Sequence, residues 1–476
     1  MKRTNTADVH FVLILHSKNK GLLPEMANSI KIRKGSDIRL KGAAELTLET
    51  PQRSDVFAIK PPNFHGLTPK LVAREGDTVK AGDCLFFDKY NDTIKFNSPV
   101  SGTVEEIVRG AKRRILEIRV KADAQNDYRD LGAKKASSMD AMELRKHLLE
   151  AGAWPFIVQR PFSITARPDS TPKAIFISGF DSAPLAPDAD FVMQGLEEDF
   201  QEGLNAMKVL ANGKPVHIGV RPDSSFYQKM DGATLHTVSG PHPAGNVGVQ
   251  IHHIDPINKG EVVWTINPQD VANIGRILRT GKYDVQRVVA VAGSKVNQPK
   301  YYRVTIGSKL DALTANIDKE GARIISGNPL NGEKVEADGF LGFFDHQVSA
   351  LPEGDEAKFL LTDGWLSPGL NKFSLSHAFP TWLMPKSKRF DLDTNTNGEE
   401  RAFVVTGQYE KVFPFDIYPV QLIKSIIVND IDAMEKLGIY EVAPEDFALC
   451  EYACTSKIDV QEIVREGLDT IMKEFS

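Results

Sequence analysis

The sequence predicts a multidomain protein of the α/β class, and three observations support that prediction. A chain of 476 residues exceeds what one hydrophobic core usually organises. Its composition, 41% hydrophobic and 25% charged, is ordinary for a folded protein. The local patterns also change along the chain, from turn-rich strands to alternating strands and helices, then to short strands and finally to helices. We therefore expect a leading segment, 1–28, followed by domains over 29–125, 126–300, 301–390 and 391–476.

The leading segment is expected to be a disordered extension, with Met26 as an alternative natural start. Its apolar run, Val9–Leu15, is far shorter than the roughly 20 residues that span a bilayer. A signal peptide stays open as an alternative, although no small-residue cleavage pattern follows the run. No other segment of the chain approaches membrane-spanning length.

Short strands broken by Gly-Asp turns predict a β-domain over 29–125. The segment 71–86 is expected to form a hairpin, and 96–104 its return strand. This pattern resembles the barrel-sandwich fold of biotinyl and lipoyl carrier domains. Those carriers present a lysine beside a methionine at a hairpin tip, whereas Lys89 has no methionine neighbour. We expect a structural module, with a carrier role for Lys89 as the alternative.

The domain over 126–300 alternates strands and helices, which predicts a three-layer, Rossmann-like sheet with helices on both faces. A helical connector is expected to begin near Ser138, a residue suited to capping. The expected strands are 173–178, 216–220 and 287–292, and the expected helices are 191–210 and 270–280.

Short alternating segments over 301–348 predict a small β-grasp unit, similar to an SLBB domain. Further β-type segments, with Trp365 and Trp382, are expected over 355–385. The tail, 419–476, is expected to be mainly helical because its apolar residues recur at helical spacing.

Composition and charge exclude several functional classes. A net charge of −5 shows no overall basic character, so no nucleic-acid partner is expected. The three cysteines, Cys84, Cys450 and Cys454, are too few for a disulfide framework and favour a reducing compartment. The sequence shows no P-loop, no Ser-His-Asp or Cys-His arrangement and no paired-carboxylate motif, so no catalytic residue is assigned.

The loop Ser239–Gly245, with the sequence SGPHPAG, is the most distinctive local feature. Two prolines fix φ on either side of His242, which is thereby held in a preformed turn. Such an imidazole can donate a hydrogen bond or a proton to a quinone carbonyl, or can simply bond a nearby backbone carbonyl. His252 and His253 are expected on opposite faces of a strand, which would exclude a shared metal. Asn267 is expected to cap a helix.

Two further loops mix aromatic and polar side chains near expected domain junctions. Phe64 and His65 lie in one, and Arg160 and Phe162 in the other. A quinone pocket requires a flat apolar slot with one or two donors, so these four residues join His242 as quinone-proximal candidates. Ordinary packing loops have the same composition and are the alternative. The basic run 112–114 is expected to be a solvated hairpin edge, with a lipid or acidic-partner contact as its alternative.

The sequence from Ser239 to Pro299 closely resembles the A subunit of the sodium-translocating NADH:quinone oxidoreductases. It includes SGPHPAG, then HHIDP, VWTINPQDV and GSKVNQP in order. The resemblance extends from about Ile30 to the C-terminus. The order of barrel, α/β domain, β-grasp and helical tail is also distantly similar to the flavin- and NADH-binding subunit of respiratory complex I and to the C subunit of the Rnf complexes.

The family resemblance implies a peripheral subunit on the cytoplasmic face of the bacterial inner membrane. In that family the complex carries electrons from NADH through FAD, FMN, riboflavin and iron–sulfur centres to quinone, and exports Na⁺. The A subunit is expected to assemble with the B to F subunits of the complex and to dock chiefly on the membrane-embedded B subunit, near the quinone site.

The departures from the distant relatives predict a subunit without its own cofactor or metal. Their glycine-rich phosphate loop corresponds to 151–162, where only Gly152 remains and Trp154 and Phe156 would crowd a phosphate. The pair Cys450 and Cys454 supplies two thiolates where an iron–sulfur centre needs four. The alternatives are a metal shared with a partner protein, a free-standing soluble flavin-dependent NADH dehydrogenase, and a purely structural adaptor.

Overall fold

The computed structural model describes residues 26–474 except 356–358, 360, 362, 363 and 365. Most of the leading segment and Trp365 therefore lie outside the described residues. Within the leading segment, Met26 already begins strand β1 (Met26–Lys31), which pairs in parallel with β14 (Thr234–Ser239). The expectation of a disordered extension through residue 28 is thus wrong at its end, because these residues join a sheet edge.

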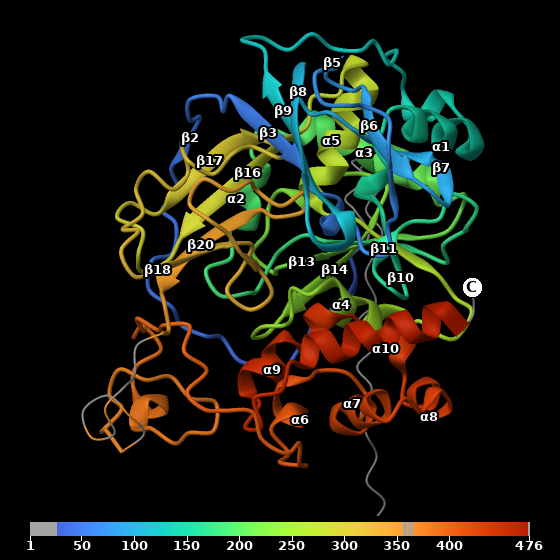
Figure 1. The fold of residues 1–476 in the computed structure, drawn as a ribbon. Coiled ribbons are helices and arrows are strands. Elements are labelled where there is room, and N and C mark those ends of the chain that lie inside the picture. Colours follow the sequence, from blue (N-terminus) through green and yellow to red (C-terminus); the bar gives the residue numbers. More distant parts are fainter. Residues whose placement is uncertain (1–25, 356–358, 360, 362–363, 365, 475–476) are drawn as a thin grey trace, which may run out of the picture.

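Two small antiparallel sheets form the barrel at the top of Figure 1. One contains β3 (Val56–Ile59), β9 (Ile115–Ala122), β8 (Gly102–Arg109) and β5 (Thr78–Val79). The other contains β4 (Pro69–Leu71), β6 (Cys84–Asp88) and β7 (Asn91–Asn97). The hairpin predicted over 71–86 is confirmed only at its ends, where β4 pairs with β6, because β5 between them pairs with β8 of the other sheet. The return strand predicted at 96–104 is wrong, since this segment covers the end of β7 and the start of β8, which lie in different sheets. Lys89 lies at the exposed tip between β6 and β7. The basic run 112–114 is an exposed turn between β8 and β9, as expected.

The central sheet has seven strands, in the order β1-β14-β13-β12-β15-β10-β11. Its remaining members are β13 (Val216–Val220), β12 (Ile175–Ser178), β15 (Val263–Thr265), β10 (Val158–Arg160) and β11 (Ile164–Thr165). The strands from β1 to β15 are parallel, whereas β10 and β11 are antiparallel. Side chains of β12 and β13 are buried on both faces, as a sheet covered on both sides requires.

Two helix predictions for this domain need correction. The helix α1 (Ala141–Glu150) is capped by Asp140 and not by Ser138, because the Asp140 carboxylate accepts from two backbone N–H groups and Glu143 completes a capping box. The expected helix 191–210 is two helices, α2 (Ala189–Met193) and α3 (Glu197–Leu210), which are separated by Gly195 in a left-handed conformation.

The paired histidines lie in a helix, α4 (Val247–Ile254), and the strand predicted for them is wrong. His252 donates to Glu441 and accepts from the Asp416 N–H, whereas His253 bonds the Val249 carbonyl. The cap of α5 (Pro268–Thr280) is confirmed, since the Asn267 side chain accepts from the Gln269 N–H.

The second sheet has the order β19-β18-β20-β16-β17-β2. Its strands are β16 (Gln286–Ala292), β17 (Lys300–Thr305), β18 (Ala322–Ser326), β19 (Glu333–Lys334), β20 (Gln347–Pro352) and β2 (Leu48–Glu49). The predicted strand 287–292 therefore exists but pairs outside the parallel sheet. Between 366 and 385 the described chain forms turns and the short 3₁₀ helix Pro380–Leu383 but no strand, so β-type segments there were wrongly expected.

The tail is helical, as predicted, and packs beneath the central sheet (Figure 1). Its helices are α6 (Tyr409–Val412), α7 (Pro419–Ile427), α8 (Ile431–Lys436), α9 (Ala448–Ala453) and α10 (Val460–Glu474). Their apolar faces share one core with Val249 of α4 and Val238 of β14. In the described part of the chain, no helix is long and apolar enough to cross a bilayer.

Candidate functional site

A cavity of about 640 Å³ opens at the carboxyl ends of β12 and β15. In the central sheet, β13 and β14 lie on one side of β12, and β15 lies on its other side. The chain connections therefore diverge between β12 and β15. Open parallel sheets bind ligands at such switch points. Residues of the barrel, the second sheet and the helical tail complete the walls, including Asn63, Phe344 and Gln461.

An ion pair between Asp181 and His346 joins the two sheets at this cavity. Asp181 follows β12, His346 precedes β20, and the Asp181 Oδ2 lies 3.2 Å from the His346 Nε2. Burial alone would lower the pKa of His346, but the hydrogen bond and charge of Asp181 outweigh it and raise that pKa. Burial opposes ionisation of Asp181 too, yet His346 holds the pKa of Asp181 below its ordinary value. Both shifts favour the ionised form of the pair.

Four buried polar atoms of residues that line the cavity have no hydrogen-bond partner within the described part of the chain. They are the Ser163 Oγ, the Asp270 Oδ2, the His346 Nδ1 and the Gln347 Oε1. Asp270 is fully buried in the first turn of α5, where its other oxygen accepts from Arg287 at 2.7 Å. When the His346 imidazole is protonated, each of its nitrogens carries a proton, and the Ser163 hydroxyl can both donate and accept. These lining residues then leave two donors and three acceptors unpaired.

Arg160 lines the cavity but is engaged in a structural ion pair. The residue is 2% exposed, and its guanidinium donates to Asp446 at 2.9 Å and also binds Glu445. These partners belong to the turn before α9, so the pair joins the central sheet to the helical tail. Burial raises the pKa of Asp446, and the charge of Arg160 and its hydrogen bond offset this rise only in part.

The other quinone-proximal candidates are only partly brought together. His65 lines the same cavity, where its Nε2 lies 2.6 Å from Asp469, and burial lowers its pKa. Phe64 is a core residue, packed between the rings of Phe96 and Phe343. Phe162 packs against the core of the helical tail and does not line the cavity.

His242 stands behind the cavity wall and does not line it. The Ser182 hydroxyl accepts from the Gly245 N–H at 2.8 Å and shares a hydrogen bond with the His242 Nδ1 at 3.1 Å. The other ring nitrogen, Nε2, is buried and has no hydrogen-bond partner among the described residues. Burial lowers the pKa of His242, in agreement with a neutral imidazole.

The loop at 151–156 is filled by its own side chains. Trp154 and Phe156 are buried, and the Trp154 indole N–H donates to the Ala166 carbonyl at 2.6 Å. A Cβ on Gly152 would lie 2.2 Å from the Asn97 side chain, so the space beside this glycine is occupied. Backbone N–H groups of such a loop have no room for a phosphate beside them.

The cysteine pair is enclosed in the helical tail. Cys450 and Cys454 are both buried around α9, and burial raises the pKa of the Cys450 thiol well above its ordinary value. Among the described residues, no group of three or more His, Cys, Asp and Glu side chains is arranged to hold a metal ion.

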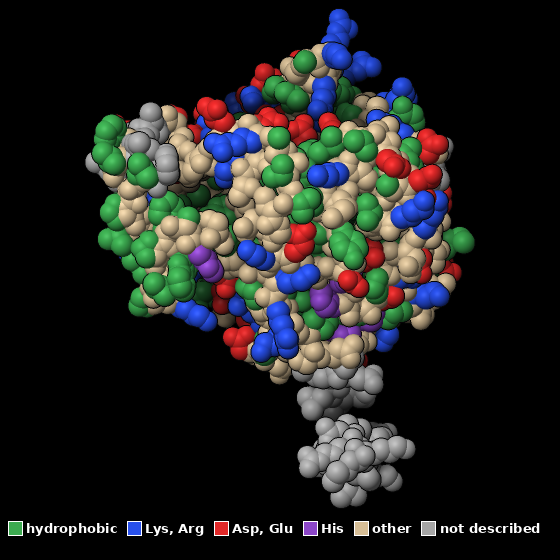
Figure 2. Space-filling view, turned by 90° about the horizontal axis from the view of Figure 1, so that it is seen from below, with side chains coloured by type: hydrophobic (Ala, Val, Ile, Leu, Met, Phe, Trp, Pro, Cys, Tyr) green, Lys and Arg blue, Asp and Glu red, His purple; other side chains and the backbone are tan. Residues whose placement is uncertain are grey.

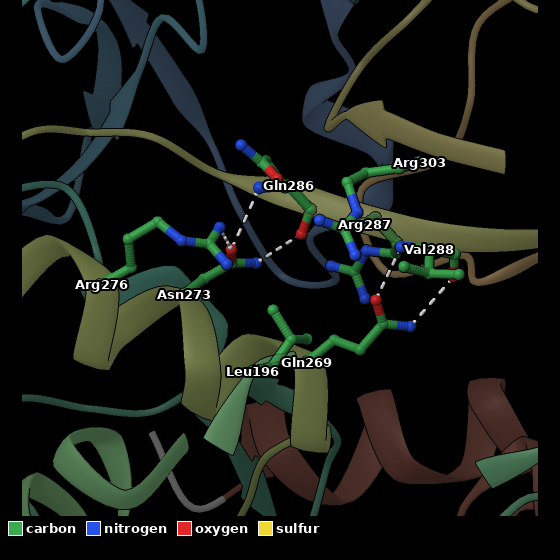
Figure 3. A pocket seen from close by; sticks show the side chains of 8 residues that line it. All are labelled: Leu196, Gln269, Asn273, Arg276, Gln286, Arg287, Val288 and Arg303. Atoms are coloured by element: carbon green, nitrogen blue, oxygen red, sulfur yellow. Dashed lines mark hydrogen bonds between the residues drawn. The ribbon is translucent and has the colours of Figure 1, made fainter. Parts of the chain in front are cut away.

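A second, much smaller pocket lies between α5 and the second sheet (Figure 3). Its volume is about 10 Å³, enough for one water molecule. The Gln269 side chain bonds the Val288 backbone, and Asn273 bonds the Gln286 carbonyl. These amides bond the edge of β16 to α5, so this pocket is a structural joint.

Sequence reasoning missed Asp181, His346 and Gln347. A usable signal existed for Asp181, because it follows a buried strand at the edge where α/β sites form. His346 lies 165 positions away in another sheet, and nothing in its local sequence indicates its partner.

The fold and cavity define the class: a multidomain α/β protein with a switch-point cavity closed by a barrel, a second sheet and a helical tail. Family models match it over three stretches: the NqrA N-terminal barrel-sandwich hybrid domain at 30–123, the NqrA second alpha/beta domain at 139–283, and the NQRA C-terminal domain at 288–337.

Curated relatives match nearly the whole chain. The A subunit of a Na(+)-translocating NADH-quinone reductase from Marinomonas sp. (strain MWYL1) is 37% identical over 93% of this chain and 99% of its own length. The same subunit from Alcanivorax borkumensis is 37% identical, and that from Pseudomonas aeruginosa 38%, each over 94% of this chain and 100% of its own length. The chain belongs to this family of A subunits. The similarity to an NAD+-reducing [NiFe]-hydrogenase (TM-score 0.36, 12% identity, 73% of this chain and 60% of that one) is too weak to carry an argument.

Proposed function

We propose that this chain is the peripheral subunit of a Na⁺-translocating NADH:quinone reductase, docked on the membrane-embedded B subunit on the cytoplasmic face. The observation that carries the proposal is the family membership, which covers more than nine tenths of the chain. As a family member, it is part of a multi-subunit oxidoreductase complex. Catalysis belongs to that complex, and this chain contributes no redox centre of its own.

Two features of the site support a cofactor-free subunit. Trp154 and Phe156 occupy the place of a phosphate loop. Each basic side chain that lines the described cavity already binds a carboxylate: Arg160 with Asp446, His65 with Asp469, and His346 with Asp181. A dinucleotide or flavin phosphate would therefore enter this cavity without a free cation to neutralise it.

The same cavity suits an uncharged, planar quinone ring. Phe156 and Phe344 supply aromatic surface. The free N–H of His346 can donate to a quinone carbonyl, and the free oxygens of Asp270 and Gln347 can accept from the hydroxyls of the quinol. We place the quinone-facing role here, and not at His242 or Phe162.

The first experiment is an absorption spectrum and metal analysis of the purified chain, followed by calorimetric titration with a short-chain quinone. A colourless, metal-free protein that binds quinone is expected. His346→Ala should weaken binding about tenfold or more, because it removes a charged donor. His253→Gln, a change of a histidine outside the cavity, serves as the control. Stoichiometric flavin or iron would contradict the proposal and favour a free-standing flavin-dependent NADH dehydrogenase.

Assembly is tested separately, by co-purification of the tagged chain with the B subunit from membranes. If the chain co-purifies with the B subunit but neither the chain nor the complex binds quinone, the result would favour the alternative of a purely structural adaptor. Absence of the other subunits from the purified material would overturn the placement in the complex.

A further inference from the structure

A lobe formed by residues 366–390 carries large hydrophobic side chains in contact with solvent. We call it the apolar lobe. It projects at the lower left of Figure 1, and Figure 2 shows hydrophobic side chains gathered over it at the left of the view. Leu366, Leu370, Trp382 and Leu383 are 50%, 54%, 55% and 70% exposed. Exposed apolar groups of this size usually mark an interaction surface.

The charge of the apolar lobe is of one sign only. The sequence contains no Asp or Glu from Gly364 to Phe390, although the whole chain has a net charge of −5. Lys386 and Arg389 are exposed beside the apolar side chains. Lys372 and Lys388 lie over the rings of Phe379 and Phe390, at 5.3 and 5.9 Å.

An ordered base holds the apolar lobe on the body of the protein. Phe390 is 1% exposed, and its backbone exchanges hydrogen bonds with the 39–41 segment. The Arg39 guanidinium donates to the Pro385 carbonyl at 2.8 Å and lies 5.3 Å from the Phe390 ring. The short helix Pro380–Leu383 is anchored by Thr381, which donates to the Lys372 carbonyl at 2.6 Å. Trp382 and Leu383 are thus presented outward from a fixed support.

We propose that the apolar lobe is a lipid-contact surface that inserts Trp382 and Leu383 into the headgroup region of an anionic bilayer. Tryptophan favours this interfacial depth. Apolar insertion combined with cations near anionic headgroups is the combination that holds peripheral proteins on membranes. The absence of any carboxylate from the sequence of the lobe matches an anionic surface, where an acidic residue would be repelled. The inference rests on the proposed membrane-peripheral function.

Flotation of the purified full chain with lipid vesicles tests the inference. Binding is expected to phosphatidylcholine vesicles that contain phosphatidylglycerol, and weaker binding to phosphatidylcholine alone. Lys386→Gln/Arg389→Gln should lower the partition coefficient about thirty-fold, the loss expected for two cations close to an anionic surface. Trp382→Ser/Leu383→Ser should lower binding to both kinds of vesicle.

Two matched variants control for the loss of exposed cations and of exposed apolar side chains at sites outside the apolar lobe. Lys112→Gln/Arg113→Gln removes two exposed cations from the β8–β9 turn, and Met142→Gln removes an apolar side chain that is 80% exposed on α1. Both should bind as the unchanged protein does, and thermal unfolding should show that every variant is folded.

The inference is overturned if the intact chain does not float with anionic vesicles, or if the lobe variants float as well as the controls. It is also overturned if those variants keep vesicle binding but no longer co-purify with the B subunit, because the lobe would then be a protein-docking surface. Co-purification is measured separately, so a failed lipid test leaves the proposed function standing, and the reverse also holds.

Discussion

At the scale of single residues, the environment of each imidazole decides what it can do. His346 has a carboxylate at hydrogen-bond distance and stays protonated to higher pH. His217 contacts another imidazole, that of His236, at 2.9 Å, and burial with this neighbour lowers the pKa of His217 to about 4. Burial lowers the pKa of His242, which lies between two prolines and contacts Ser182. Of these three histidines, only His346 has a raised pKa and also lines the cavity.

The Asp181–His346 pair should make stability depend on pH in a defined window. The pKa of Asp181 is lowered, so its contribution is present above the unfolded value, about 3.9, and is lost in stronger acid. The pKa of His346 is raised, so its contribution is complete below the unfolded value, about 6.5, and fades as the pH rises through the folded value.

Asp181→Asn should therefore lower the free energy of unfolding by about 1–3 kcal/mol between roughly pH 4 and pH 6.5, and by less above that range. Urea unfolding at about pH 5.5 and about pH 8.5 measures the difference. The control is Asp318→Asn, whose exposed carboxylate pairs with Lys295 and should show no such contrast. An equal loss at both pH values would contradict an ionised pair.

At the scale of elements, glycines set the distance between α3 and α5. Gly203 lies against the Val271 carbonyl, and a Cβ there would be 1.9 Å from it. A Cβ on Gly275 would be 1.8 Å from the Asp199 carbonyl. Neither glycine is at a turn, and alanine would otherwise favour a helix by about 1 kcal/mol. The helices need this close approach, because α5 also bonds to β16 through Gln269 and Asn273.

Gly275→Ala should destabilise the protein by about 1–3 kcal/mol, since the helices must separate to admit one methyl group. Gly398→Ala is the matched control, because its Cβ would meet only Lys457, at 3.6 Å. Unfolding in urea distinguishes the two variants. A Gly275→Ala protein as stable as the control would show that the helix pair can relax at little cost.

At the scale of the whole molecule, buried ion pairs and shared strands tie the domains into one body. Arg160 connects the central sheet to the tail through Asp446. The strand β2, which precedes the barrel in sequence, pairs with β17 of the second sheet. The candidate cavity exists only because these parts surround the same switch point.

Arg160→Met should cost about 3–5 kcal/mol, because it leaves the Asp446 carboxylate buried without its cation. Arg160→Met/Asp446→Asn should recover part of that loss. The ion pair between the exposed Lys259 and the partly buried Glu435 provides the control, and Lys259→Met should cost much less. If the double variant is no more stable than the single one, packing of the guanidinium and not the stranded charge explains the loss.

Local sequence determined the class of the protein and most of its elements. Asn267 before Pro268 predicts the start of a helix, and α5 begins there. The apolar run at 216–220 predicts a strand, and β13 covers it. Both predictions depend on only a few neighbouring residues, as helix caps and buried strands do. Contiguous family motifs located the chain among its relatives, since that signal also lies in short runs of residues.

Tertiary structure alone decided the site. It assigned the strand at 287–292 to a different sheet, enclosed Phe64 in a core, engaged Arg160 with the tail, and brought Asp181 to His346 across 165 positions. Strand partners, burial and ion pairs between distant segments are properties of the packed chain, set by the total burial of all its domains. No short window of sequence contains that information.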